Sequence, residues 1–228
     1  MDARSKIWYL ENFNLLKGLE KPEIEYLSKI TTMREFGKDQ PIYFAKQPST
    51  SIFFLKRGRV KLSRMSKDGK EMILGIVNAG EVFGEQAFLD EEQRTDYAFA
   101  MDSALLCTIS KQDFKEFVER TPDLNFKITK LIGFRLKRYS ERIEELMFKD
   151  SKQRVVSFLL KFAEDNGQSV ADEIFVKPFL KHQDIGELTA CSRQTVNLIL
   201  TELRDKNIID FDRRKLIIRN KSILGEMV

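Results

Sequence analysis

Between residues 31 and 109, short apolar segments recur at close intervals with polar residues between them. The segments are IYFA, SIFFL, GRVKLSRM, EMILGIV, EVFGEQAF, DYAFAM and ALLCTI. Turn signals separate them. The clearest is Asp68-Gly69, which predicts a hairpin whose two turn residues both adopt positive φ. Many short strands at this spacing predict a small barrel or jelly roll.

Helical patterns flank the predicted strands. Residues 6–29 carry such patterns with a break at Gly18 and Pro22. Ser110, followed three residues later by Asp113, has the form of a capping box with Asp in place of Glu. Thr121-Pro122 predicts a second helix start with proline at the first helical position, and the pattern then runs to about residue 149.

The long helical segment carries apolar residues at heptad spacing. They follow one another at intervals of 4, 3, 4 and 3 and are Ile132, Leu136, Tyr139, Ile143 and Leu146. This repeat is typical of a two-stranded parallel coiled coil, in which one helix from each of two subunits contributes. A helix packed on its own barrel is the other interpretation, although the segment is long for a surface helix.

Residues 182–201 predict two short helices joined by a tight turn. Ile185 and Leu188 would be the inner face of the first helix, Ala190-Cys191 the turn, and Ser192 the N-cap of the second. Gly186 is small where the second helix must come close. One buried stripe at helical spacing is expected from Val196, Ile199, Leu200 and Leu203.

The second of these helices carries residue types that read base edges in a major groove, namely Arg193, Gln194 and Asn197. After it, residues 208–218 predict a β-hairpin whose basic tip contains Arg213 and Arg214. A plain helix pair is the alternative interpretation. Because the hairpin lies where the wing of a winged helix-turn-helix would lie, we expect DNA binding, with phosphate contacts giving most of the affinity.

Composition excludes several other classes of protein. The chain has 228 residues, of which 42% are hydrophobic and 32% charged, and a net charge of +4. It has no apolar run near the roughly 20 residues needed to span a bilayer, and no signal-peptide pattern, so we expect a soluble cytoplasmic protein. One histidine, His182, and two cysteines, Cys107 and Cys191, are too few for a zinc site, an iron–sulfur cluster or a cupin enzyme. We expect no metal, no heme and no catalysis.

From about residue 13 to 220 the chain resembles the Crp/Fnr family, that of the cyclic-AMP receptor protein and the fumarate–nitrate regulator. The resemblance rests on GKEMILGIVNAGEVFGE, RLKRYSERIEEL, CSRQTVNLIL and RDKNII. It implies an α+β protein with three parts: a jelly-roll barrel with N-terminal helices at 1–120, a dimerisation helix at 121–149 and a winged helix-turn-helix at 150–228. It also implies a homodimer on a pseudo-palindromic DNA operator, with RNA polymerase as a partner.

The resemblance assigns roles to residues of the DNA-binding part. Ser192, Arg193, Gln194 and Thr195 match the start of the family's recognition helix, and Arg193 is expected to read a guanine. Gln194 replaces a glutamate and Leu198 replaces a second arginine of the cyclic-AMP receptor, so the operator should differ. His182 and Gln183 match positions that approach phosphates, although a solvated helix start explains His182 equally well. The polar segment 164–173 is a candidate polymerase-facing loop.

The barrel carries part of the receptor's ligand pattern. Gly84 and Glu85 match the segment that holds the ribose, Arg94 and Thr95 match the pair that holds the cyclic phosphate, and Tyr139 and Ser140 match the adenine contacts. With Arg135 they make up the candidate effector set. Gln86 replaces a leucine and Tyr139 is larger than the receptor's threonine. Asp96 follows the phosphate pair, and whether it points away or folds back toward Arg94 is open.

Three states of the barrel follow from this pattern: it binds cyclic AMP, it binds another small anionic effector, or it has no effector and is constitutively active. The departures slightly favour the last. A cyclic-nucleotide-binding module that acts on a protein partner is the alternative function, which the winged helix-turn-helix disfavours. Whether the regulator activates or represses is not encoded in these motifs.

Overall fold

The computed structural model describes residues 15–89, 92–171 and 173–228, so the helical pattern expected at residues 6–14 lies outside the described residues. The chain divides into two compact units, Met1–Leu136 and Lys137–Val228. This division falls inside helix α4 (Asp123–Phe148), which occupies most of the range assigned to a dimerisation helix. Among the described helices, none combines the length and apolar character needed to cross a membrane.

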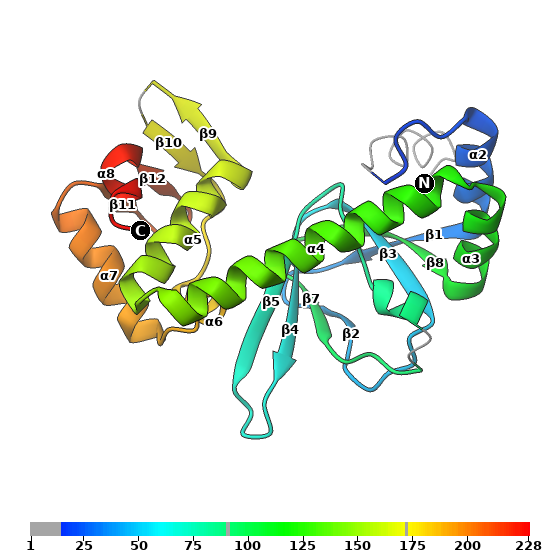
Figure 1. Cartoon of the computed structure of the whole chain (residues 1–228), viewed down its shortest axis with the longest axis horizontal. Helices are drawn as coiled ribbons and strands as arrows, with labels where there is room; N and C mark the ends of the chain where they lie inside the picture. Colours follow the sequence, from blue (N-terminus) through cyan, green and yellow to red (C-terminus); the bar gives the residue numbers. More distant parts are fainter. Residues whose placement is uncertain (1–14, 90–91, 172) are drawn as a thin grey trace. The chain divides into compact units, whose positions relative to one another are not determined.

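Two four-stranded antiparallel sheets form the barrel of the first unit (Figure 1). One has the order β1 (Thr31–Phe36), β8 (Ala104–Ser110), β3 (Ser51–Arg57), β6 (Val82–Phe83); the other is β2 (Pro41–Tyr43), β7 (Tyr97–Ala100), β4 (Val60–Met65), β5 (Glu71–Val77). The predicted jelly-roll barrel is therefore confirmed. Strand β1 was missed, because its sequence TTMREF lacks a continuous apolar run.

Alternation along strand β3 separates two cores. Phe54 faces a core shared with helices α2 (Lys21–Ile30) and α3 (Lys111–Arg120), where it packs near Phe114. Phe53 points to the other side, into the barrel interior, where its ring stacks on Phe83 at 5.0 Å. Successive strand residues face opposite sides, so the interior is lined by every second residue of each strand.

The hairpin between β4 and β5 forms as predicted, but the predicted turn type is wrong. Of its two central residues only Gly69 has a positive φ, +77°. The Ser66 N–H donates to the Lys70 carbonyl at 2.9 Å and the Gly69 N–H donates to the Ser66 carbonyl at 3.0 Å. The loop is thus longer than a two-residue turn, and a single glycine in the left-handed region is enough to close it.

The helix starts after the barrel follow the predicted signals only in part, because the Asp113 carboxylate bonds to the Ser110 hydroxyl and not to the Ser110 N–H that a capping box requires. Ser110 is the N-cap of α3: its hydroxyl accepts from the Asp113 N–H at 3.0 Å and donates to the Asp113 carboxylate at 2.6 Å. Helix α4 begins at Asp123, one residue after Pro122, so proline directly precedes the assigned helix rather than occupying its first position. A short 3-10 helix, η1 (Glu85–Leu89), follows β6.

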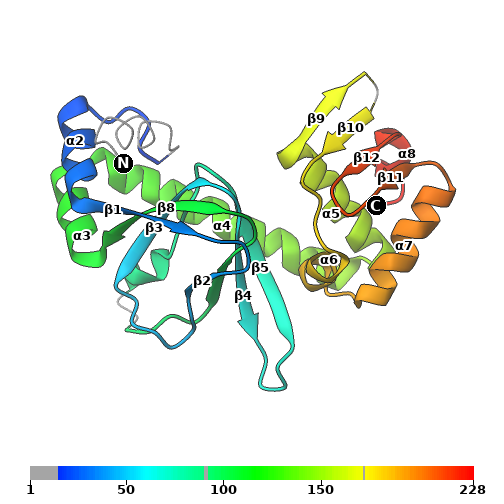
Figure 2. The same ribbon diagram turned by 180° about the vertical axis from the view of Figure 1, so that it is seen from behind.

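The second unit contains α5 (Ser151–Asn166), α6 (His182–Thr189), α7 (Arg193–Asp205) and α8 (Lys221–Gly225) beside a sheet (Figure 2). The sheet order is β11 (Ile209–Phe211), β12 (Leu216–Ile218), β10 (Glu173–Val176), β9 (Gly167–Val170). The expected loop at 164–173 is wrong, because α5 extends to Asn166 and residues 167–170 pair with β10. Strand β9 is polar and exposed, and backbone hydrogen bonds rather than burial hold it in place.

Candidate nucleic-acid interface and ligand position

Helices α6 and α7 form a tight helix-turn-helix for reasons visible in the chain. Ala190 adopts the left-handed conformation, φ 54°, and the Cys191 N–H returns to the Gly186 carbonyl at 2.9 Å. A Cβ atom at Gly186 would lie 2.7 Å from the Cys191 carbonyl oxygen, so a glycine is required there. The backbone of the turn at Cys191, rather than the second helix, is what leaves no room for a larger residue at position 186. Cys191 in this turn is half-buried.

Helix α7 is fixed by its cap and its buried stripe. The Ser192 hydroxyl accepts from the Thr195 N–H at 3.0 Å and lies 2.8 Å from the Thr195 hydroxyl. The four residues of the predicted stripe are fully or nearly fully buried: Val196, Ile199, Leu200 and Leu203. The cap and the stripe are therefore confirmed, and Thr195 is bound to the cap, which leaves its hydroxyl already engaged.

The opposite face of α7 is exposed and carries the predicted base-reading side chains. Arg193, Gln194 and Asn197 are exposed on the first two turns. Leu198 lies on the same face with 71% of its surface exposed. Leu198, which the sequence places where the cyclic-AMP receptor has an arginine, thus lies on the same exposed face as the predicted base-reading residues.

His182 lies between the second helix and the hairpin rather than at a freely solvated helix start. Its ring packs edge-on against Phe211 with 5.5 Å between centroids, and its side chain is hydrogen-bonded with Asn197. Burial lowers the pKa of His182 and the Arg193 charge lowers it further, while the Asn197 bond acts in the opposite sense. His182 therefore joins α6 to α7. Gln183 is engaged with Glu187 at 2.7 Å.

The hairpin of β11 and β12 forms at the predicted residues. The Asp212 carboxylate accepts from the Arg214 N–H at 2.6 Å and the Lys215 N–H at 2.9 Å, which shapes the turn and lowers the pKa of Asp212. Both Arg213 and Arg214 are exposed at the tip. The tip thus presents two guanidinium groups while the one acidic residue of the turn is used by the backbone.

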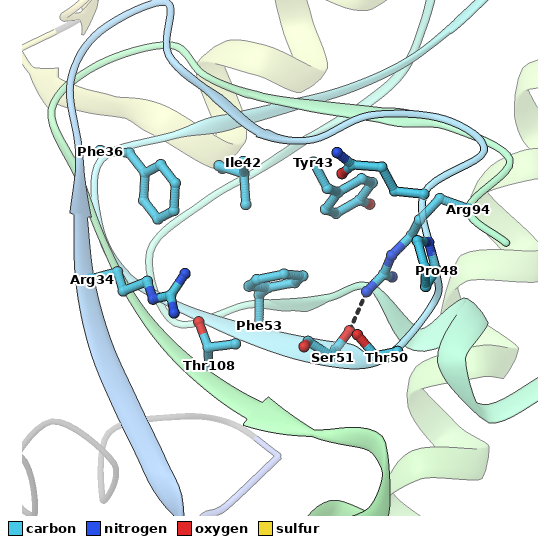
Figure 3. Close-up of a pocket in the computed structure, with 11 residues that line it drawn as sticks. Arg34, Phe36, Ile42, Tyr43, Pro48, Thr50, Ser51, Phe53, Arg94 and Thr108 are labelled. Atoms are coloured by element: carbon cyan, nitrogen blue, oxygen red, sulfur yellow. Dashed lines mark hydrogen bonds between the residues drawn. The ribbon is translucent and has the colours of Figure 1, made fainter. Parts of the chain in front are cut away.

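The position of Arg94 differs from that of a solvent-facing phosphate ligand. This side chain is only 3% exposed, and its guanidinium carbon lies 4.4 Å from the centre of the Tyr43 ring. It donates to the Gly84 carbonyl at 3.0 Å and to the Ser51 carbonyl (Figure 3). Burial lowers the pKa of Arg94, and the nearby Tyr43 and Asp96 oppose that shift. Its donors are directed to the protein's own backbone.

Asp96 folds into the barrel rather than away from it. It is 4% exposed, and the Tyr43 hydroxyl donates to its carboxylate at 3.2 Å. Burial raises the pKa of Asp96, while Tyr43 and then Arg94 lower it. Arg94 and Asp96 are two residues apart and share a side, whereas Thr95 between them is exposed. Asp96 therefore folds back toward Arg94 instead of pointing away from it. A carboxylate in this position is unfavourable to a phosphate.

Other members of the candidate effector set also have protein partners. Glu85 forms an ion pair with Arg135 of α4, and Arg135 also donates to the Val82 carbonyl. The Thr95 hydroxyl accepts from Arg64 at 2.8 Å, and Thr95 bonds to Gln86 through both its N–H and its hydroxyl. Gly84 has a φ of +81°, and a Cβ atom there would lie 2.9 Å from Phe53 and 3.0 Å from Arg94.

Tyr139 and Ser140 belong to the second compact unit, where Tyr139 is 45% exposed and Ser140 is exposed. The residues that sequence reasoning missed are Tyr43, Ser51 and Arg64. No motif could identify Tyr43 and Ser51, since they come from β2 and β3, far from Arg94 along the chain.

The predicted heptad residues of α4 form a stripe that the single chain leaves exposed. Their exposed fractions are 45% for Ile132, 66% for Leu136, 45% for Tyr139, 62% for Ile143 and 42% for Leu146. Such large apolar side chains at heptad spacing are usual where a second helix covers them. The interpretation of α4 as a helix wholly packed on its own barrel does not account for these exposures.

Comparison with known proteins identifies both parts of the chain. A cyclic nucleotide-binding domain matches residues 33–121, and a Crp-like helix-turn-helix domain matches residues 153–227. The chain is 29% identical over 192 residues to a global nitrogen regulator of Nostoc sp., covering 83% of this chain and 86% of that protein.

Two further similarities span nearly the whole length. The chain is 23% identical to a CRP-like cAMP-activated global transcriptional regulator of Mycobacterium tuberculosis, over 95% of this chain and 96% of that one. The structure of FixK2 from Bradyrhizobium japonicum superposes with a TM-score of 0.77 at 21% identity, covering 87% of this chain and 97% of the other. At that identity the superposition supports the shared fold.

Proposed function

Because the chain belongs to the Crp/Fnr family of bacterial transcription regulators, we propose that it binds a pseudo-palindromic operator as a homodimer and does so without cyclic AMP. It acts in the cytoplasm, with RNA polymerase as a further partner and with no catalytic activity. The observation that carries the proposal is the exposed, polar N-terminal half of α7 beside a basic wing, in one compact unit.

Base recognition comes from the first turns of α7. Two such helices in a dimer enter successive major grooves about 34 Å apart. Arg193 donates two hydrogen bonds to a guanine, and Gln194 pairs with an adenine, where a glutamate would accept from cytosine. The exposed Leu198 offers an apolar contact for a thymine methyl group. The proposed operator therefore has guanine, adenine and thymine within each half-site.

Positioning on the duplex comes from groups that meet phosphates. Arg213 and Arg214 at the hairpin tip supply charge, and His182 and Gln183 at the start of α6 lie at the family's phosphate-approaching positions. These contacts give affinity that falls as salt rises, and they carry no base preference. Substitution of a phosphate-contacting residue should therefore weaken binding to all DNA sequences, whereas substitution of a base-reading residue should change the base preference.

Dimerisation through α4 is supported by the exposed heptad stripe. A second copy of the same helix covers the stripe in a parallel arrangement, with Leu136 and Ile143 at a positions and Ile132, Tyr139 and Leu146 at d positions. The seam would set the spacing between the two DNA-binding units. The function as a module that acts only on a protein partner is disfavoured, because such a module has no use for a recognition helix.

The cyclic-nucleotide position does not fit the nucleotide. A phosphate would need the Arg94 fork, which is bound to two backbone carbonyls beside the buried Asp96. A ribose would need Glu85, which pairs with Arg135. In place of a ligand, the Glu85–Arg135 pair links η1 at the end of the barrel to α4. The DNA-competent state would then be the populated one without an effector.

Operator affinity measured with and without cyclic AMP tests this proposal. For the wild type we expect the same affinity in both conditions, and no heat of nucleotide binding by calorimetry. Arg135→Ala removes the Glu85 pair and should weaken operator binding, whereas Lys137→Ala, an exposed lysine two residues further along α4, should not. Two results would overturn the proposal that the protein binds its operator without an effector. One is a higher operator affinity of the wild type in the presence of cyclic AMP. The other is equal operator affinity of the Arg135→Ala and Lys137→Ala variants.

A further inference from the structure

An aromatic cluster holds the start of α6 against the hairpin of β11 and β12. The Phe211 ring of β11 lies 6.5 Å from the Phe179 ring and 5.5 Å from the His182 ring, both measured between centroids. The guanidinium carbon of Arg204 in α7 lies 5.1 Å from the centre of the same Phe211 ring. The Phe179 N–H donates to the Arg214 carbonyl at 2.9 Å, which ties the hairpin to the segment before α6. The half-buried His182 ring is therefore fixed edge-on to Phe211 and has little freedom to turn.

The fixed ring contacts the proposed base-reading face of α7. Its side chain is hydrogen-bonded with Asn197, which is exposed in the second turn of that helix. Arg193 lies one turn earlier on the same exposed face. His182 belongs to α6 and yet touches the helix face that is proposed to enter the major groove. It can therefore act on base recognition through Asn197.

The direction of this hydrogen bond follows from its effect on the ring. Burial and the Arg193 charge lower the pKa of His182, whereas the Asn197 bond raises it. A bond that raises the pKa of an imidazole favours the protonated ring, so the ring N–H donates and the Asn197 amide oxygen accepts. An amide side chain has one acceptor oxygen and one amino group with two donor hydrogens. With its oxygen held by His182, Asn197 is left to present the amino group to the groove.

An amide held in this way should not read the base that asparagine usually reads. A free asparagine amide pairs with adenine, because its oxygen accepts from N6 and its nitrogen donates to N7. An amide that presents only donors suits the acceptors of the major groove, which are N7 and O6 of guanine and O4 of thymine. It opposes cytosine, whose N4 amino group is itself a donor. The contact with His182 thus changes which bases Asn197 can select.

We propose that His182 is a positioning residue for base recognition: it holds the Asn197 oxygen, so that Asn197 donates to a guanine or thymine and rejects cytosine. The inference rests on the proposed binding of an operator by α7. This role of His182 adds to its approach to a phosphate and can be separated from it, because phosphate contacts carry no base preference.

A histidine titration in the full-length protein without DNA tests the pair. His182 is the only histidine of the chain, so its ring signals in a proton magnetic resonance spectrum are unambiguous. Asn197→Leu keeps the size of the side chain and removes its oxygen. The pKa of His182 should then fall below the wild-type value, because the bond that raises it is lost. Gln194→Leu makes the same kind of change one turn earlier and should leave the His182 pKa unchanged. An equal or higher pKa in Asn197→Leu would overturn the inference.

Binding-site selection from random DNA tests the effect on base preference, with each variant first checked for an unchanged thermal midpoint. In Asn197→Ala one base pair should lose its preference, which identifies the pair that Asn197 reads. The wild type should disfavour cytosine there about tenfold, and His182→Ala should reduce this to about threefold or less, which is the effect of about one hydrogen bond. Gln183→Ala, at the neighbouring phosphate-approaching position, should weaken binding without changing any base preference.

Conservative variants separate positioning from a general structural role. The amide of His182→Gln or His182→Asn can donate in place of one ring nitrogen, so at least one of them should keep the wild-type base preference. An operator recovered with the same preferences in the wild type and in His182→Ala would overturn this inference and leave the proposed function intact. So would a preference for adenine at the base pair that Asn197 reads. A wild type that selects no operator would overturn the proposed function, and the reading role of Asn197 with it.

Discussion

The substitution Ile143→Ala should weaken the dimer without unfolding the chain. Ile143 is 62% exposed in the single chain, so its side chain contributes little to the core. Full burial of such a side chain stabilises by about 1.5–3 kcal/mol. The exposed fraction thus accounts for about 1–2 kcal/mol per subunit, and each dimer loses two copies. Truncation to alanine should cost about 2–3 kcal/mol per dimer, which raises the dissociation constant about 30- to 150-fold.

Sedimentation velocity over a range of protein concentrations measures this constant. Phe134→Ala is the matched control, because Phe134 is 56% exposed on the same helix but lies two residues past Ile132, off the heptad seam. The control should dimerise like the wild type. The reasoning is wrong if the two variants shift the dimer constant equally, or if the wild type sediments as a monomer throughout.

Arg193→Ala should weaken operator binding by about 1–3 kcal/mol per half-site and relax the preference at one base pair; unchanged preference in a binding-site selection would contradict the guanine contact. Arg213→Ala, in contrast, should weaken binding to operator and random DNA alike and reduce the slope of log affinity against log salt by about one per subunit. A loss confined to the operator would assign it a base-reading role. Because its pKa is lowered, His182 favours the neutral ring in the folded protein. The stability that His182 contributes is therefore present above pH 6.5, the unfolded value, and is lost as pH falls through the lower pKa of the folded state. Denaturation midpoints at pH 7.5 and 5.5 should therefore differ less in His182→Asn than in the wild type, and an equal difference would exclude this residue as the cause.

The helix-turn-helix was predictable because short-range rules fix its local structure. The cap at Ser192, the left-handed turn and the buried stripe through Leu200 lie within one segment of sequence, and local periodicity determines which face is left exposed. Leu198 was noted only as a replacement for an arginine. Leu198 is exposed because the opposite face of α7 is the one that is buried.

The barrel was predictable as a fold and much less so as a site. Arg94 matches a phosphate ligand by motif, yet its surroundings are set by Tyr43 and Ser51, which lie about 50 and 43 residues away and reach it only through the sheet topology. Which residues of β1 and β8 face the barrel interior also depends on strand pairing, which no motif records. Strand β9 escaped prediction because polar residues can form an edge strand when the backbone alone pairs.

Selection of binding sites from random DNA, at fixed salt and with or without cyclic AMP, tests the central claim most directly. The account predicts that one two-fold symmetric site is recovered equally in both conditions, with half-sites whose centres are one helical turn apart. A symmetric site recovered only with the nucleotide would restore Glu85, Arg94 and Thr95 as ligand residues. Recovery of no symmetric site at all would contradict the homodimeric operator-binding regulator itself.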